Sequence, residues 1–113
     1  MKILVIDNNL GRHSVHDEML SNEFPDALIE IVENIKREDL EKSDVDFIII
    51  HRNNPENDIV ERNCKIGRIR IFFSGGLPKY QQFDNDHYVP IKQLRDRTKA
   101  IINEQTDKVE KVN

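Results

Sequence analysis

The chain has 113 residues, enough for one ordinary domain with its own core and too few for two. Its 21 acidic and 17 basic residues give a formal net charge of -4, so nucleic acid, itself a polyanion, is not an expected partner. The single cysteine, Cys64, allows neither an intramolecular disulfide nor a Cys-x-x-Cys metal pair, and the first apolar run is far shorter than a membrane span. We therefore expect a cytoplasmic domain that does not bind membranes.

Strand and helix patterns alternate along the first half of the chain. In order, we predict a strand at 3–6, a helix at 10–24, a strand at 27–32, a short helix within 34–42 and a strand at 45–50. Continuous apolar runs at the first and third strands are typical of strands buried on both faces of a parallel sheet. The helix at 10–24 is predicted from an apolar stripe formed by Val15, Met19, Leu20 and Phe24. The acidic strand at 27–32 is expected at a sheet edge.

The second half continues the alternation less regularly. We predict a brief helix at 56–64, a strand at 69–73, a short strand at 88–91 and a C-terminal helix carrying Leu94, Thr98, Ile101 and Ile102. No convincing amphipathic helix is found between Gly75 and His87. Pro90 places the last strand at an edge, because its missing N–H then breaks no ladder bond. One domain over residues 1–106 and a polar tail at 107–113 follow.

The alternation of strands and helices predicts an α/β fold, with right-handed crossovers and a parallel sheet covered on both faces. Ligand sites in such sheets lie at the carboxyl ends of the strands. In a flavodoxin-like order, four segments meet at that edge: Asp7-Asn8-Asn9, residues 51–55, Ser74-Gly75 and the region of Lys92. These segments are the candidate functional residues.

The order of these segments resembles the receiver domain of bacterial response regulators. The resemblance implies a doubly wound five-stranded parallel sheet in the order 2-1-3-4-5, here with shortened third and fourth helices. It implies that Asp7 and Asn8 stand where receivers hold Mg²⁺, and that Ser74 and Lys92 stand near the switch hydroxyl and the lysine. His51 stands where receivers carry the phosphorylated aspartate, since Pro55 follows four residues later.

A histidine at this position removes the chemistry of the family. An aspartate there attacks the phosphoryl donor and ligates the metal, whereas a neutral imidazole offers a hard cation no charge. We therefore expect a receiver-like protein that is not phosphorylated, is not an enzyme, needs no cofactor and works through protein contacts in signal transduction. The resemblance implies a partner surface containing Tyr80, Phe83 and Tyr88. The partner is a kinase or another regulator, and a homodimer is left open.

Alternatives remain for several of these residues. The alternative is a metal site or a small metal-dependent enzyme that uses Asp7, His13, His16 and His51, because the i, i+3, i+4 spacing of His13, His16 and Asp17 places three ligands on one helical turn. We favour the simpler reading that His13 and His16 lie on the solvated side of the first helix. His51 could also be phosphorylated itself or act as a base. Asp7 and Ser74 could merely cap a helix or a turn.

Overall fold

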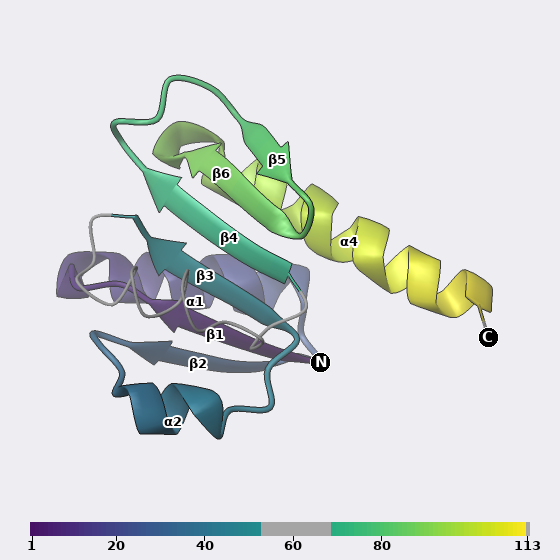
Figure 1. Cartoon of the computed structure of the whole chain (residues 1–113), viewed down its shortest axis with the longest axis horizontal. Coiled ribbons are helices and arrows are strands. Elements are labelled where there is room, and N and C mark those ends of the chain that lie inside the picture. The colour runs from purple at the N-terminus through teal and green to yellow at the C-terminus, as the bar shows by residue number, and fades with distance from the viewer. Residues whose placement is uncertain (53–68, 113) are drawn as a thin grey trace.

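The computed structural model describes residues 1–52 and 69–112, which form an α/β fold around one sheet (Figure 1). The strands are β1 (Lys2–Ile6), β2 (Leu28–Val32), β3 (Phe47–His51), β4 (Ile69–Ser74), β5 (Gln81–Phe83) and β6 (Asp86–Pro90). Their order in the sheet is β2-β1-β3-β4-β6-β5. All neighbouring pairs are parallel except β5 and β6, which are antiparallel.

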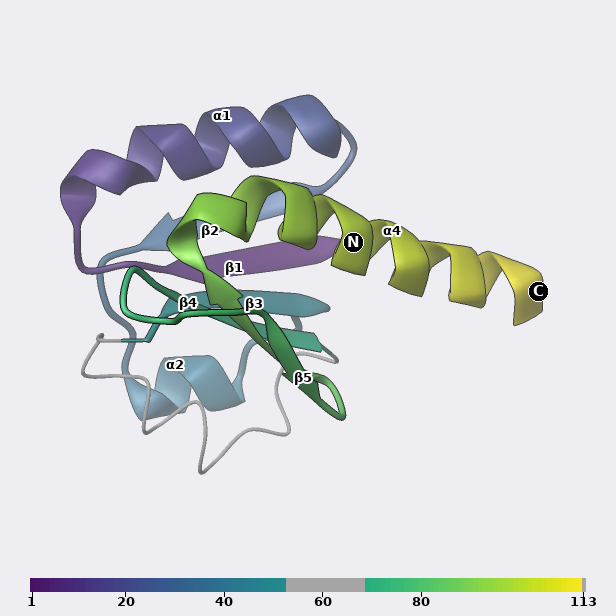
Figure 2. The same ribbon diagram turned by 90° about the horizontal axis from the view of Figure 1, so that it is seen from above.

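Helices cover both faces of this sheet (Figure 2). The described helices are the 3-10 turn η1 (Leu10–Arg12), α1 (His13–Glu23), α2 (Arg37–Glu41), the 3-10 turn η2 (Ile91–Gln93) and α4 (Leu94–Val112). Figure 2 shows α1 and α4 on one face and α2 on the other. None of the described helices is long and apolar enough to cross a membrane.

Two apolar clusters fill the space between these layers. The cluster under α1 and α4 includes Val5, Leu20, Ile49, Phe73 and Ile102, and the cluster on the α2 side is built around Leu4, Leu40 and Ile50. Alternate residues of β1 and β3 thus point into different clusters, which is why their sequences read as continuous apolar runs. The prediction of central, doubly buried strands is confirmed for both.

The predicted strand count is wrong, because the sheet has six strands instead of five. The additional strand β5 forms a hairpin with β6 across Asp84 and Asn85, and Asp84 adopts a left-handed conformation with φ 53°. Asp tolerates this conformation better than most residues, and it suits a tight hairpin turn. β6 is therefore an inner strand, and the prediction that residues 88–91 lie at an edge is also wrong.

The predicted helices are confirmed in part. The first, second and C-terminal helices are present. The residues between β4 and β6 form no helix, as their sequence indicates, so the shortened fourth helix implied by the receiver resemblance is wrong and β5 stands there instead. The brief helix predicted at 56–64 lies outside the described residues. α4 runs to Val112, through the segment separated above as a polar tail, so the boundary at residue 107 stays a prediction.

Within α1, the predicted apolar stripe is confirmed for its later residues only. Met19, Leu20 and Phe24 are buried, but Val15 is 62% exposed. His16 takes the inward position instead, three and four residues before Met19 and Leu20. The cause lies in the polar groups that His16 meets at the end of β1.

Candidate functional site

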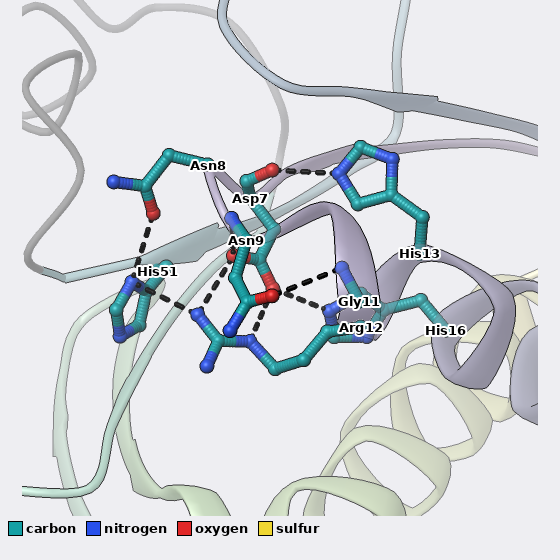
Figure 3. A network of polar contacts seen from close by, with 8 residues as sticks. All are labelled: Asp7, Asn8, Asn9, Gly11, Arg12, His13, His16 and His51. Carbon is teal, nitrogen blue, oxygen red and sulfur yellow. Dashed lines mark hydrogen bonds and ion pairs between the residues drawn. The ribbon is translucent and has the colours of Figure 1, made fainter.

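Asp7 is the centre of a buried polar network at the carboxyl edge of the sheet (Figure 3). It directly follows β1, and its main-chain N–H donates to the carbonyl of Val32 at 3.0 Å. A buried carboxylate is costly unless hydrogen-bond donors surround it. The first donor is local, because the N–H of Asn9 lies 2.9 Å from Asp7 Oδ1.

Arg12 supplies the counter-charge to Asp7. Its Nε donates to Oδ2 at 2.7 Å and its Nη2 donates to Oδ1 at 2.8 Å, a two-pronged contact. The turn η1 aims this side chain, and Asn9 caps the turn by accepting the N–H of Gly11 at 2.9 Å. No motif singles out Arg12 in the sequence. The available signal was the buried strand-end acid itself, which needs a cation within reach.

The Asp7–Arg12 pair is fully charged near neutral pH. Burial would raise the pKa of the Asp7 carboxyl group, but hydrogen bonds from Arg12 and His16 outweigh burial and hold this pKa well below its ordinary value. The hydrogen bond to Asp7 also raises the pKa of the Arg12 guanidinium. Neither group therefore changes its protonation state near neutral pH.

His16 is buried against this pair, with only 3% of its surface exposed. Its Nε2 lies 2.8 Å from Asp7 Oδ2, and since a carboxylate only accepts, Nε2 carries the hydrogen. Burial lowers the pKa of His16 more than the Asp7 carboxylate raises it, which favours a neutral ring. The expectation that His16 is solvated is wrong, because a buried carboxylate on another element compensates its polarity.

His13 lies at the outer side of the network and is half-buried. Its Nε2 is 2.6 Å from the main-chain carbonyl oxygen of Asp7, so this nitrogen is also the donor. His13 thus binds the backbone of the residue whose side chain holds His16. The expectation that His13 lies on the solvated side is wrong as well, because the main-chain carbonyl of Asp7 gives its ring a hydrogen-bond partner.

His51 ends β3 and reaches the network from the other side. Its Nδ1 lies 3.3 Å from Arg12 Nη2 and 3.3 Å from Asn8 Oδ1. Arginine only donates and an amide oxygen only accepts, so Nδ1 satisfies one of these contacts at a time. Burial and the charge of Arg12 both lower the pKa of His51, which favours the neutral ring accepting from Arg12.

Ser74 and Lys92 do not join this network within the described residues. Ser74 ends β4, and its buried hydroxyl oxygen accepts the N–H of Gly76 at 3.1 Å, which caps the turn after the strand. Lys92 is exposed in η2 and lines a groove beside Arg12 and His16. The topology thus brings Asp7, Asn8 and His51 into one network, in which Arg12 links Asp7 to His51, while Ser74 caps the turn after β4.

The donors around Asp7 do not fit a divalent cation. The two carboxylate oxygens already accept hydrogen bonds from Asn9, Arg12 and His16, and a guanidinium occupies the side on which a cation would gain most. Within residues 1–52 and 69–112, no group of three or more His, Cys, Asp or Glu side chains is arranged to hold a metal ion. The geometry therefore gives no support to the alternative site of Asp7, His13, His16 and His51.

The three aromatic residues expected at a partner surface lie on different faces of the sheet. Tyr80 packs against the cluster under α4, and Tyr88 packs against the cluster on the α2 side, stacked on Phe72 with ring centroids 5.1 Å apart. Phe83 is 59% exposed and touches Tyr88 edge-on. Tyr80 and Tyr88 therefore do not belong to one continuous patch.

Fold and site define an α/β protein with a mostly parallel sheet and a carboxyl edge closed by a buried, charge-balanced network. Comparison of the chain with family models, with curated proteins and with solved structures finds no match. The receiver resemblance accordingly stays an expectation.

Proposed function

We propose that this protein is a receiver-like regulatory module that binds another protein and does not accept a phosphoryl group. Its parallel strands lie side by side in the order β2, β1, β3, β4 and β6, an arrangement compatible with a flavodoxin-like fold. The short strand β5 is added antiparallel at the outer edge, beside β6. The site residues that the resemblance implies lie at the carboxyl edge, where open α/β sheets bind their ligands.

One observation carries the second part of this proposal, that no phosphoryl group is accepted: the guanidinium of Arg12 lies between the Asp7 carboxylate and the ring of His51 (Figure 3). Phosphoryl transfer to an acidic side chain needs a nucleophilic carboxylate and a cation that neutralises the phosphoryl oxygens. Here the strand-end nucleophile is replaced by a histidine, and the remaining carboxylate is neutralised by a protein side chain. The site is held together by fixed charges in place of an exchangeable cation.

Imidazole can itself accept a phosphoryl group, so His51 needs a separate argument. Attack through Nδ1 would cost the contact with Arg12, and attack through either ring nitrogen would have to start from a ring that lies against Phe73 with centroids 5.2 Å apart. No carboxylate orients the His51 ring in the described part of the chain, whereas His16 has Asp7. These contacts support an inert role for His51 in the network.

The test combines intact mass and amide NMR of the purified protein with Mg²⁺, before and after addition of acetyl phosphate, with beryllofluoride in parallel. We expect no added phosphoryl mass and no shifts at Asp7, His51 or Ser74. A phosphoryl adduct would overturn the proposal. The variant His51→Ala then identifies the acceptor, because an adduct on His51 disappears in it and an adduct elsewhere does not.

A further inference from the structure

We propose that the groove between α1 and the start of α4 binds an acidic amphipathic helix of a partner protein. The inference rests on the proposed function, because it names the partner chemistry of a module that works by protein contacts. The groove has a volume of about 410 Å³ and lies on the face of the sheet that α1 and α4 share (Figure 2). None of Tyr80, Phe83 and Tyr88 lines this groove.

The floor and one wall of this groove are apolar. Met19 and Leu94 form a nearly buried floor, Ile91 is half-buried, and Val15 stands 62% exposed on the wall. Val15 is β-branched, and β-branched residues have a lower helix propensity than Ala or Leu. Helix formation alone therefore does not explain a valine at this exposed position of α1. The three less exposed side chains continue the apolar surface beneath it, so a partner that covers the groove would bury Val15 together with them.

The rim of the groove carries positive charge on a chain whose net charge is -4. Arg12, Lys92 and Arg95 line it, against the single acid Glu18. Arg12 is balanced by Asp7, and Arg95 meets Glu23 only at 3.7 Å while 69% exposed, which is a weak surface contact. Lys92 has no ion pair with any described residue. With Arg12 balanced by Asp7, the described lining keeps Lys92 and Arg95 against Glu18, a small positive excess that favours an acidic partner.

The shape of the groove favours a helix over a small molecule. Small-molecule sites enclose most of their ligand, whereas the exposed Val15 and Arg95 show that this groove opens to solvent along its rim. Two neighbouring helices on one face provide the ridges between which a third helix packs. A partner helix would place apolar residues at i, i+3, i+4 and i+7 on the floor, with Asp or Glu flanking them beside Lys92 and Arg95.

The test uses two synthetic amphipathic helices of about 18 residues, long enough to hold some helix alone. Both carry the same Leu stripe, flanked by Glu in one peptide and by Lys in the other. Binding to the full chain is measured by fluorescence anisotropy, and the site is mapped by amide NMR. We expect the Glu peptide to bind, with shifts confined to α1, η2 and the first turns of α4, and affinity that falls as salt is added.

Charge reversal at the rim separates the groove from general attraction. Lys92→Glu should weaken binding of the Glu peptide about tenfold, whereas Lys79→Glu, the same change at an exposed position outside the groove, should change it less than about twofold. Val15→Asp should also weaken binding, and because Val15 is exposed this variant should fold normally. Equal loss in Lys79→Glu and Lys92→Glu would overturn the inference.

Three further results would overturn the inference: no binding of the Glu peptide up to about 1 mM, equal binding of both peptides, or shifts centred on Phe83 and Tyr88. Self-association through the groove, seen as a concentration-dependent mass that Val15→Asp abolishes, would overturn it as well. Failure here and failure of the proposed function are distinguishable. A phosphoryl adduct would remove the proposed function whatever the peptides do, and absent peptide binding leaves the adduct test unaffected.

Discussion

His16 and His87 are both buried beside a polar partner, at opposite edges of the sheet. His16 meets the Asp7 carboxylate at the carboxyl edge, and His87, near the amino end of β6, lies with its Nδ1 2.6 Å from the hydroxyl of Tyr80. An arginine accompanies each pair, Arg12 on Asp7 and Arg97 stacked over the Tyr80 ring at 4.1 Å. Burial lowers the pKa of both histidines.

The difference between the two regions is one buried charge. The Asp7 carboxylate needs several donors drawn from the turn and from α1, so it ties three segments of the chain to one point. The pair of Tyr80 and His87 is neutral and is joined by one short hydrogen bond, which fastens the segment before β5 to β6, while the Tyr80 hydroxyl also reaches Gln82 Oε1 at 3.4 Å. A network that confines a charge restricts geometry more strongly than a neutral pair, and it is the network that occupies the edge used for ligands.

The largest expected effect follows from removing the counter-charge. Arg12→Ala leaves the Asp7 carboxylate buried with its two strongest donors gone, and the free energy of unfolding should fall by about 3 kcal/mol. Arg12 is 26% exposed, and water entering its place keeps the loss at the low end for a buried pair. Urea unfolding at neutral pH measures this change.

The matched control is Arg37→Ala, which removes an arginine from an exposed pair with Glu41 on α2. This variant should lose less than about 0.5 kcal/mol. If the two variants lost equal stability, the network around Asp7 would be no more than a surface ion pair, and the contrast between the two regions would disappear.

A smaller effect is expected at the neutral pair. Tyr80→Phe keeps the ring under Arg97 and removes only the hydroxyl that meets His87, so the free energy of unfolding should fall by about 1–2 kcal/mol. Urea unfolding again gives the value, and amide exchange should show faster opening of β5. A loss as large as that of Arg12→Ala would mean that the buried charge has no special weight.

The same contrast explains which parts of the fold were predictable. β1 and β3 were found because a doubly buried strand must be apolar at every position. β5 was missed because three residues, two of them Gln, carry no alternation, and its only signal was the turn-forming Asp84 beside Asn85. Because β5 pairs with β6, β6 is an inner strand of the sheet and not the edge strand that Pro90 suggested. Short antiparallel additions depend on tertiary pairing more than on local pattern.

The candidate site divides in a similar way. Topology alone brought Asp7, Asn8 and His51 to one edge, since the carboxyl ends of parallel strands meet there. Arg12 and the inward turn of His16 escaped prediction because both answer the desolvation of Asp7, which is set by the packed sheet. Helical periodicity counts histidine as a polar residue and therefore predicts that His16 lies on the solvent side of α1. The buried carboxylate of Asp7 makes the inward position favourable instead.

The smallest effect is a difference in how the two histidines titrate. Since both folded pKa values lie below the ordinary 6.5, the unfolded chain binds more protons, and the stability associated with these rings is present above pH 6.5 and is lost as pH falls below it. Histidine ring NMR should therefore show His16 and His87 still neutral slightly below pH 6.5.

In Arg12→Ala the titrations of the two histidines should separate. The charge of Arg12 no longer opposes protonation of His16, and the Asp7 carboxylate that has lost Arg12 attracts the proton. The pKa of His16 should therefore rise, while that of His87 stays unchanged. Parallel titration of both rings in this variant would show that Arg12 does not control the proton on His16, and that the two buried histidines respond to burial alone.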